Sequence, residues 1–153
     1  MAIISQETTL AVAYLQNDVV AIPTETVYGL AANALRADLV ARIFEVKARP
    51  TFDPLIVHTC SLEQVERLVT SFPAPLKALA KAFWPGPLTL LLPKSNVIPD
   101  IVTSGLNRVG IRMPDHAITL KLIEQCGFPL AAPSANPFGY ISPTKPEHVQ
   151  AQL

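Results

Sequence analysis

The chain has 153 residues, of which half are apolar and 16% are charged, and its formal net charge is zero. This length and composition fit a single globular domain and exclude a disordered, highly charged chain. No apolar run reaches the ~18 residues of a membrane-spanning helix, and no basic stretch opens the N-terminus as in a secretory signal. We therefore expect a cytoplasmic protein with no membrane partner.

Fifteen prolines, about one residue in ten, stand singly at the ends of apolar runs, where they end strands and helices. Helical and strand patterns alternate irregularly, which indicates an α/β fold with a twisted open sheet of mixed parallel and antiparallel strands and flanking helices. The spacing predicts helices over 6–17, 37–47, 62–70 (opened by a capping box, Ser61 to Gln64), 75–83, 116–126 (capped by Asp115) and from Pro146 onward, and strands over 18–24, 54–58, 87–93, 109–113 and 129–136.

Charges are unevenly distributed along this neutral chain. Residues 1–35 contain three carboxylates and no cation, whereas residues 67–112 contain six cations and one carboxylate. The positive segment could face a phosphate-bearing ligand or be solvated, and charge alone favours solvation. The cysteines and histidines are too far apart for a metal-ligand spacing, so we expect no protein-held metal and two reduced cysteines.

Residues 23–30, PTETVYGL, follow the first predicted strand. Two hydroxyls and a carboxylate at the carboxyl end of a strand suit a ligand site in an open α/β sheet. The same residues suit a simple turn, in which Thr24 and Thr26 bond local backbone and Gly29 takes a positive φ. The residues alone leave these two interpretations equally supported.

Two further segments carry polar residues. Lys47 and Arg49 end a predicted helix, where cations complement the helix dipole or clamp a phosphate; for so short a motif, the first interpretation is favoured. Ser134, Asn136 and Ser142 lie in a loop rich in proline and glycine. Their hydroxyls and amide can hold a ribose, a base edge or phosphate oxygens, or can simply form turns.

His58 and Arg112 lie on predicted strands. A lone histidine on an apolar strand is more often a core residue than a ligand. Arg112 lies between Ile111 and Met113, and facing inward it needs an anion or several acceptors, such as a substrate carboxylate. The sequence contains no common glycine-rich phosphate loop, nucleophile elbow or zinc motif.

Taken in order, six segments resemble the YrdC/Sua5 family of threonylcarbamoyl-AMP synthases. No single segment is specific, but six in sequence order along nearly the whole chain are. The resemblance implies a twisted open α/β sheet whose concave, positive face holds the active site. The six segments are PTETVYGL at 23–30, Lys47-x-Arg49-Pro50, PLIVH at 54–58, WPGPLTL at 84–90, VGIRMP at 109–114 and APSANPFGYISPT at 132–144.

Members of this family join L-threonine, bicarbonate and ATP into L-threonylcarbamoyl-AMP and pyrophosphate, using Mg²⁺. A partner transferase complex then passes the threonylcarbamoyl group to an adenine beside the tRNA anticodon. The resemblance implies that Lys47 and Arg49 hold the ATP phosphates and carry the catalysis. It also implies that Ser134, Asn136 and Ser142 contact the nucleotide, that Thr26, His58 and Arg112 surround threonine with Arg112 on its carboxylate, and that Thr24 and Tyr28 shape this pocket.

The sequence departs from the family pattern at three points. Ala31 stands where glycine is usual after YGL, and Arg108 stands where serine or threonine is usual. Family members also continue for several dozen residues beyond the position of Leu153, with segments that complete both ligand sites. The resemblance therefore predicts one domain over 1–153 that lacks its C-terminal part.

Two other functions remain open from the sequence. The same fold could serve as a double-stranded RNA-binding or ribosome-maturation module without catalysis, to which the basic segment 67–112 would contribute. The second alternative is a carbamoyl-handling domain, similar to the one in hydrogenase-maturation carbamoyltransferases. We rank the synthase first.

Overall fold

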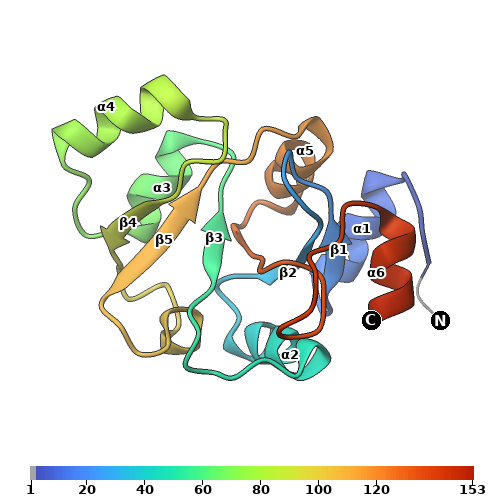
Figure 1. Cartoon of the computed structure of the whole chain (residues 1–153). Helices are drawn as coiled ribbons and strands as arrows, with labels where there is room; N and C mark the ends of the chain where they lie inside the picture. The colour runs from blue at the N-terminus through green and yellow to red at the C-terminus, as the bar shows by residue number, and fades with distance from the viewer. Residues whose placement is uncertain (1–2) are drawn as a thin grey trace.

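The computed structural model describes residues 3–153 as one six-stranded open sheet with flanking helices (Figure 1). The strand order is β1-β2-β6-β3-β5-β4; β3 and β5 are parallel and the other neighbours are antiparallel. The predicted mixed sheet is thereby confirmed. The strands are β1 (Val20–Ile22), β2 (Gly29–Asn33), β3 (Ile56–His58), β4 (Leu90–Pro93), β5 (Arg108–Arg112) and β6 (Leu130–Ala131). The helices are α1 (Thr8–Leu15), α2 (Ala37–Lys47), α3 (Leu62–Leu68), α4 (Ala74–Phe83), η1 (a 3-10 helix, Asp100–Thr103), α5 (Ala117–Cys126) and α6 (Pro146–Gln152).

One face of the sheet carries the larger apolar core. Val57 of β3 is paired in register with Ala131 of β6 and Ile111 of β5, so these three side chains point to the same face. Helix α2 packs its apolar side, including Val40 and Ile43, into the same cluster. All five residues are fully buried. This core fixes α2 relative to the sheet and thereby positions Lys47 at the end of the helix.

The opposite face is covered unevenly. Helices α1 and α5 pack there against β1, β2 and β6, in a second cluster that includes Leu15, Ile123 and Leu130. His58 is in register with Leu130 and with Arg112, so both polar side chains project from this second face. Leu91, on the same face at the edge strand β4, is 58% exposed. The edge of this face at β4 is therefore exposed to solvent.

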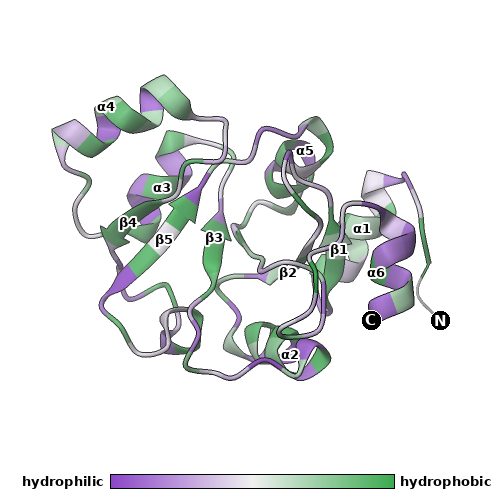
Figure 2. Cartoon of the chain, in the orientation of Figure 1, coloured by the Kyte–Doolittle hydropathy of each residue, from purple (hydrophilic) through white to green (hydrophobic). Residues whose placement is uncertain are grey.

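The hydropathy of the strands follows this arrangement (Figure 2). Strands β3 and β4 are predominantly hydrophobic, whereas β5 is apolar in its middle and hydrophilic at both ends, where Arg108 and Arg112 lie. Among residues 3–153, the structure contains no helix long and apolar enough to cross a membrane.

Several predicted elements need correction. Strand β2 and helix η1 were not predicted, and the predicted strand 129–136 is ordered as a strand only at 130–131. Gly29 begins β2 and does not have a positive φ, so the predicted turn role is wrong. A Cβ atom at Gly29 would lie 3.2 Å from the Cβ of Ala132 and 3.3 Å from the carbonyl oxygen of Pro133. Close approach of β2 to the segment after β6 therefore favours glycine here.

The helix ends show where local signals succeed and fail. The hydroxyl of Ser61 accepts a hydrogen bond from the backbone N–H of Gln64 at 3.1 Å, and the Gln64 side chain accepts one from the N–H of Cys60, which confirms the cap of α3. Asp115 is not the cap of α5, because the helix begins one residue later, with His116 at the N-cap. The other predicted boundaries shift by a few residues.

Leu92 and Leu91 offer a matched test of the larger core. Leu92 is fully buried and Leu91 is 58% exposed, although they are neighbours in β4. We expect Leu92→Ala to lower the free energy of unfolding by about 2–5 kcal/mol, because it removes transfer energy and leaves a cavity. Leu91→Ala should change it by only about 0.5 kcal/mol. Denaturant titration of both variants measures the difference, and equal losses would contradict the assigned faces of β4.

Candidate functional site

The loop between β1 and β2 is held by a network around Thr24. Its hydroxyl donates to the carbonyl of Val27 at 2.7 Å and accepts from the N–H groups of Thr26 and Val27, each at 3.2 Å. The hydrogen bonds of the Thr24 hydroxyl therefore confirm that Thr24 bonds local backbone in a turn. The turn also fixes the backbone on both sides of Glu25, so the two interpretations of PTETVYGL are compatible.

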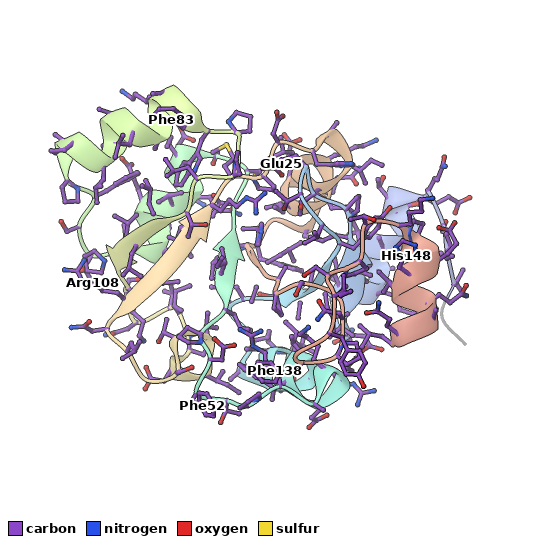
Figure 3. All side chains as sticks on the ribbon, in the orientation of Figure 1. Glu25, Phe52, Phe83, Arg108, Phe138 and His148 are labelled. Carbon is purple, nitrogen blue, oxygen red and sulfur yellow. The ribbon has the colours of Figure 1, made fainter. Side chains whose placement is uncertain are left out.

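Arg112 joins this loop to the end of β5. Its Nη2 lies 2.6 Å from Oε1 of Glu25 and 3.4 Å from Oγ1 of Thr26, and its Nε donates to the carbonyl of Gly86 at 3.3 Å. The side chains of Arg112 and Glu25 are 11% and 19% exposed. Figure 3 shows Glu25 at the tip of the loop between β1 and β2. The anion that Arg112 requires is thus provided by the chain itself.

Glu25 is a residue of this site that the sequence did not assign. Burial raises the pKa of its carboxyl, but hydrogen bonds from Arg112 and from the backbone N–H groups of Glu25 and Asp115, together with the charge of Arg112, leave the pKa below its usual value. Glu25 is therefore ionised at neutral pH. The only sequence signal was the carboxylate within PTET, and nothing local to that segment indicates that it meets Arg112.

His58 lies beside Arg112 on the adjacent strand and is 3% exposed. Burial and the positive charge of Arg112 lower its pKa to about 4, so the imidazole is neutral at pH 7. Its Nδ1 atom is buried and has no hydrogen-bond partner among residues 3–153. A neutral imidazole with an unpaired nitrogen can accept a hydrogen bond from a ligand hydroxyl.

Lys47 is buried at the end of α2, with 1% of its surface exposed. Its ammonium group donates to the backbone carbonyls of Ser134 and Asn136. Burial and the charge of Arg49 lower its pKa to about 8. Lys47 lies in the last turn of α2, as complementing the helix dipole requires, and its side chain also points into the protein and binds the loop after β6.

Arg49 lies two residues further on, with 14% of its side chain exposed. Its Nη2 lies 2.7 Å from Oδ2 of Asp53 and donates to the carbonyl of Pro54 at 3.3 Å. Its guanidinium carbon lies 5.9 Å from the centroid of the Phe138 ring, within cation–π range. Figure 3 shows Phe138 on the loop over α2. Lys47 and Arg49 thus contact the same loop from two sides.

Backbone hydrogen bonds connect the loop after β6 to the loop before β2. The N–H of Tyr28 donates to the carbonyl of Pro143, and the N–H of Ala135 donates to the carbonyl of Tyr28, both at 2.8 Å. Asn136 is 4% exposed; its amide nitrogen bonds two carbonyls, and its Oδ1 atom has no partner among the described residues. Ser142 is half-buried in the same loop. All eight predicted site residues therefore lie on segments that are connected to one another.

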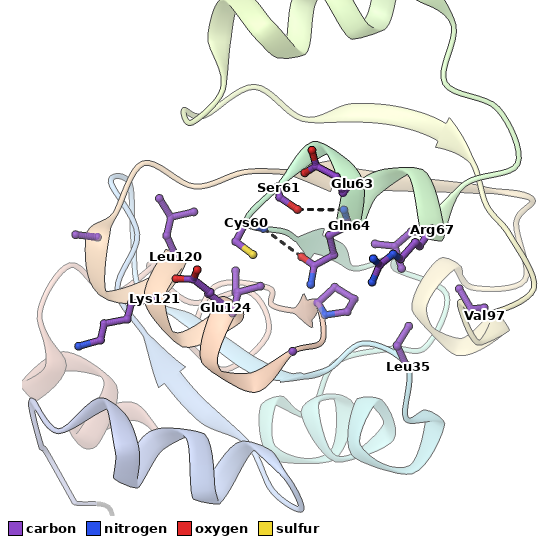
Figure 4. Close-up of a pocket in the computed structure, with 15 residues that line it drawn as sticks. Leu35, Cys60, Ser61, Glu63, Gln64, Arg67, Val97, Leu120, Lys121 and Glu124 are labelled. Atoms are coloured by element: carbon purple, nitrogen blue, oxygen red, sulfur yellow. Dashed lines mark hydrogen bonds between the residues drawn. The ribbon is translucent and has the colours of Figure 1, made fainter.

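A separate hollow of about 840 Å³ lies between α3 and α5 (Figure 4). Its walls include Cys60, Gln64 and Arg67 on one side and Leu120 and Glu124 on the other. None of the predicted site residues is among the described residues that line it. The hollow and the predicted site are therefore different places on the molecule.

The fold and the site together define an open-sheet α/β protein with cations, hydroxyls, an amide and a neutral imidazole around two connected loops. Such a set suits a phosphate-bearing ligand and a small carboxylate, and it contains no nucleophile paired with a base. A family model, Sua5/YciO/YrdC, described as "Telomere recombination", matches residues 13–153. The chain belongs to this family.

Curated relatives and solved structures agree with this membership. The chain is 57% identical over 134 residues to a threonylcarbamoyl-AMP synthase of Pyrococcus abyssi and 54% identical over 139 residues to one of Bacillus subtilis. These matches cover 88% and 90% of this chain but 39% and 40% of the relatives. The chain thus spans about 40% of their length.

The structure of P. abyssi Sua5 complexed with L-threonine superposes with a TM-score of 0.93 at 53% identity, over 95% of this chain and 43% of that one. A HypF structure in a phosphate- and nucleotide-bound form has a TM-score of 0.83 at 23% identity and shows only that the fold is shared. The predicted family and fold class are confirmed.

The pKa of His58 gives a test of its buried position. The folded pKa is about 4 and the unfolded value is 6.5. Between these values the unfolded chain binds more protons, so the free energy of unfolding should fall as the pH is lowered from 6.5 to 4, by up to about 3 kcal/mol. His58→Asn should remove this contribution, and His148→Asn, at an exposed position, should retain it. Urea titrations at several pH values measure the slopes; equal slopes in all three proteins would contradict the burial of His58.

Proposed function

We propose that this chain forms the catalytic site of an L-threonylcarbamoyladenylate synthase, a nucleotidyltransferase that converts L-threonine, bicarbonate and ATP into L-threonylcarbamoyl-AMP and pyrophosphate. Lys47 forms one cluster with Ser134 and Asn136, and Arg112 forms another with Thr26. The observation that carries the proposal is that the backbone hydrogen bonds of Tyr28 connect the loops of these two clusters. The names of the relatives and the L-threonine complex of P. abyssi Sua5 support it.

In this proposal the cluster around Arg112 binds L-threonine. Nη1 of Arg112 has no partner among residues 3–153, which leaves it free for the substrate carboxylate. Nδ1 of His58 accepts a hydrogen bond from the threonine hydroxyl, because the imidazole is neutral and Nδ1 has no partner among residues 3–153. Thr26 adds a second hydroxyl, and Thr24 and Tyr28 hold the loop in shape.

The cluster around Lys47 binds ATP. An ammonium group has three donors, and two of them bind carbonyls here, so one remains for a phosphate oxygen. Arg49 adds a second cation on the same loop. Oδ1 of Asn136 is an unused acceptor for a ribose hydroxyl or the adenine amino group, and the hydroxyls of Ser134 and Ser142 complete the nucleotide contacts.

The reaction then needs positioning and charge neutralisation. The α-ammonium group of threonine first loses a proton to solvent, and the resulting amine attacks bicarbonate and releases water, which gives a carbamate. A carbamate oxygen attacks the α-phosphorus of ATP, and the bond to the pyrophosphate oxygen breaks. In this proposal Lys47 and Arg49 neutralise the leaving pyrophosphate, and no protein nucleophile is required.

In this proposal Mg²⁺ binds together with ATP. Among the described residues, no three histidine, cysteine, aspartate or glutamate side chains gather into a metal site. The carboxylate of Glu25 is already paired with Arg112. This donor set does not fit a magnesium ion held by the protein alone, whereas Mg²⁺ commonly binds through substrate phosphates and water.

The product requires a partner, and we assign this role to a transferase complex that passes the threonylcarbamoyl group to tRNA in the cytoplasm.

Double-stranded RNA binding stays the second candidate. Within residues 67–112, Lys77 pairs with Glu66, Lys94 with Asp100 and Arg112 with Glu25, so three of the six cations are already compensated. Nucleic-acid binding would weaken steeply between about 50 and 200 mM salt, and binding of ATP or threonine would change much less.

Lys47→Ala tests the proposed ATP site. We expect pyrophosphate release that depends on threonine and bicarbonate to fall by at least about 100-fold, because a buried cation that faces the transferred phosphates is removed. Lys81→Ala is the control, since Lys81 is exposed on α4. A coupled pyrophosphate assay measures both variants, and circular dichroism checks that they fold. Full turnover in Lys47→Ala would rule out the assigned role of Lys47.

A further inference from the structure

We propose that Glu25 recognises the α-ammonium group of the amino-acid substrate, so that Glu25 and Arg112 together bind the substrate as a zwitterion. The inference rests on the proposed function, and it assigns a specificity role to a residue that the family resemblance left without one. It starts from the geometry of the Glu25–Arg112 pair.

Each partner of the pair keeps some capacity for further hydrogen bonds. Arg112 contacts Glu25 through Nη2, which also reaches Thr26, and its Nε binds the carbonyl of Gly86. Nη1 has no partner among residues 3–153. Glu25 contacts Arg112 through Oε1, and its carboxylate also accepts hydrogen bonds from the backbone N–H groups of Glu25 and Asp115. A carboxylate has about four acceptor positions, so one position remains for a ligand.

The charges of the pair define the ligand that fits. Glu25 and Arg112 cancel each other, and the neighbouring His58 is uncharged at neutral pH. A ligand with a carboxylate alone would be attracted by Arg112 and repelled by Glu25. An amino acid carries both charges one carbon apart, so its carboxylate can meet Nη1 of Arg112 while its ammonium group meets the remaining acceptor position of Glu25. The pair therefore discriminates by charge pattern as well as by shape.

The pair is also protected enough for these contacts to matter. The two side chains are 11% and 19% exposed, so charge-assisted hydrogen bonds here are screened less than on an open surface. The turn around Thr24 holds the backbone of Glu25, and the ladder between β3 and β5 holds that of Arg112. The backbone positions of both charged residues are therefore set before a ligand binds.

Glu25→Gln separates ammonium recognition from a merely structural role. Glutamine keeps the shape and an oxygen acceptor for Arg112 but loses the negative charge. Isothermal titration should compare L-threonine with 3-hydroxybutanoate, which is threonine without its amino group. We expect the preference for threonine over 3-hydroxybutanoate, the ratio of their Kd values, to fall at least about tenfold in Glu25→Gln, because a hydrogen bond to a charged group contributes about that much.

The control is Glu45→Gln, at an exposed ion pair with Arg42, and it should keep the wild-type ratio. If Glu25 only positions Arg112, both ligands should weaken equally and the ratio should stay constant, which would overturn the inference while leaving the proposed function intact. If the folded wild-type protein binds no threonine, the proposed function fails together with the role of Glu25. Thermal unfolding of each variant confirms that the proteins compared are folded.

Discussion

The burial of the Lys47 ammonium group is the constraint on which the site depends. Removing an ammonium group from water costs several kcal/mol unless acceptors replace the solvent, and here the carbonyls of Ser134 and Asn136 replace it. The apolar face of α2 fixes where Lys47 can reach. The loop after β6 must therefore follow the lysine, and through Tyr28 it also fixes the loop before β2. A core contact on one face of the sheet thus sets the backbone of a polar site.

The ion pair between Arg112 and Glu25 fixes a loop in the same way, because a buried charge requires a partner. A guanidinium at the end of an apolar strand would be costly without a partner, and Glu25 supplies one from 87 residues away in the sequence. Because such pairs join distant segments, they fix loops that have few apolar contacts of their own. The polar contacts in this half of the molecule therefore contribute to order as well as to ligand recognition, and substitutions there should be judged by both effects.

The separation along the sequence between contacting residues explains which features could be predicted from the sequence. The cap of α3, the long helix α2 and the proline-bounded strands follow from local signals. Strand β2 was missed because the segment around Gly29 resembles a turn, although its partner β1 is its neighbour in the sequence. Its pairing with β6 is a contact between residues about 100 positions apart. The burial of Lys47 and the partner of Arg112 are likewise long-range facts. Only the resemblance of six ordered segments brought these residues together, and it assigned no role to Glu25.

The unsatisfied atoms of the structure connect this architecture to ligand binding. Within residues 3–153, four buried side-chain atoms have no hydrogen-bond partner, and two of them, Nδ1 of His58 and Oδ1 of Asn136, belong to the predicted site. Each unpaired buried group costs about 1–3 kcal/mol. A ligand that donates a hydrogen bond to one of these atoms recovers this cost on binding, so part of the affinity of each ligand is stored in the folded protein. One such atom lies in each of the two clusters, which is the distribution expected if two different ligands bind side by side on one connected pair of loops.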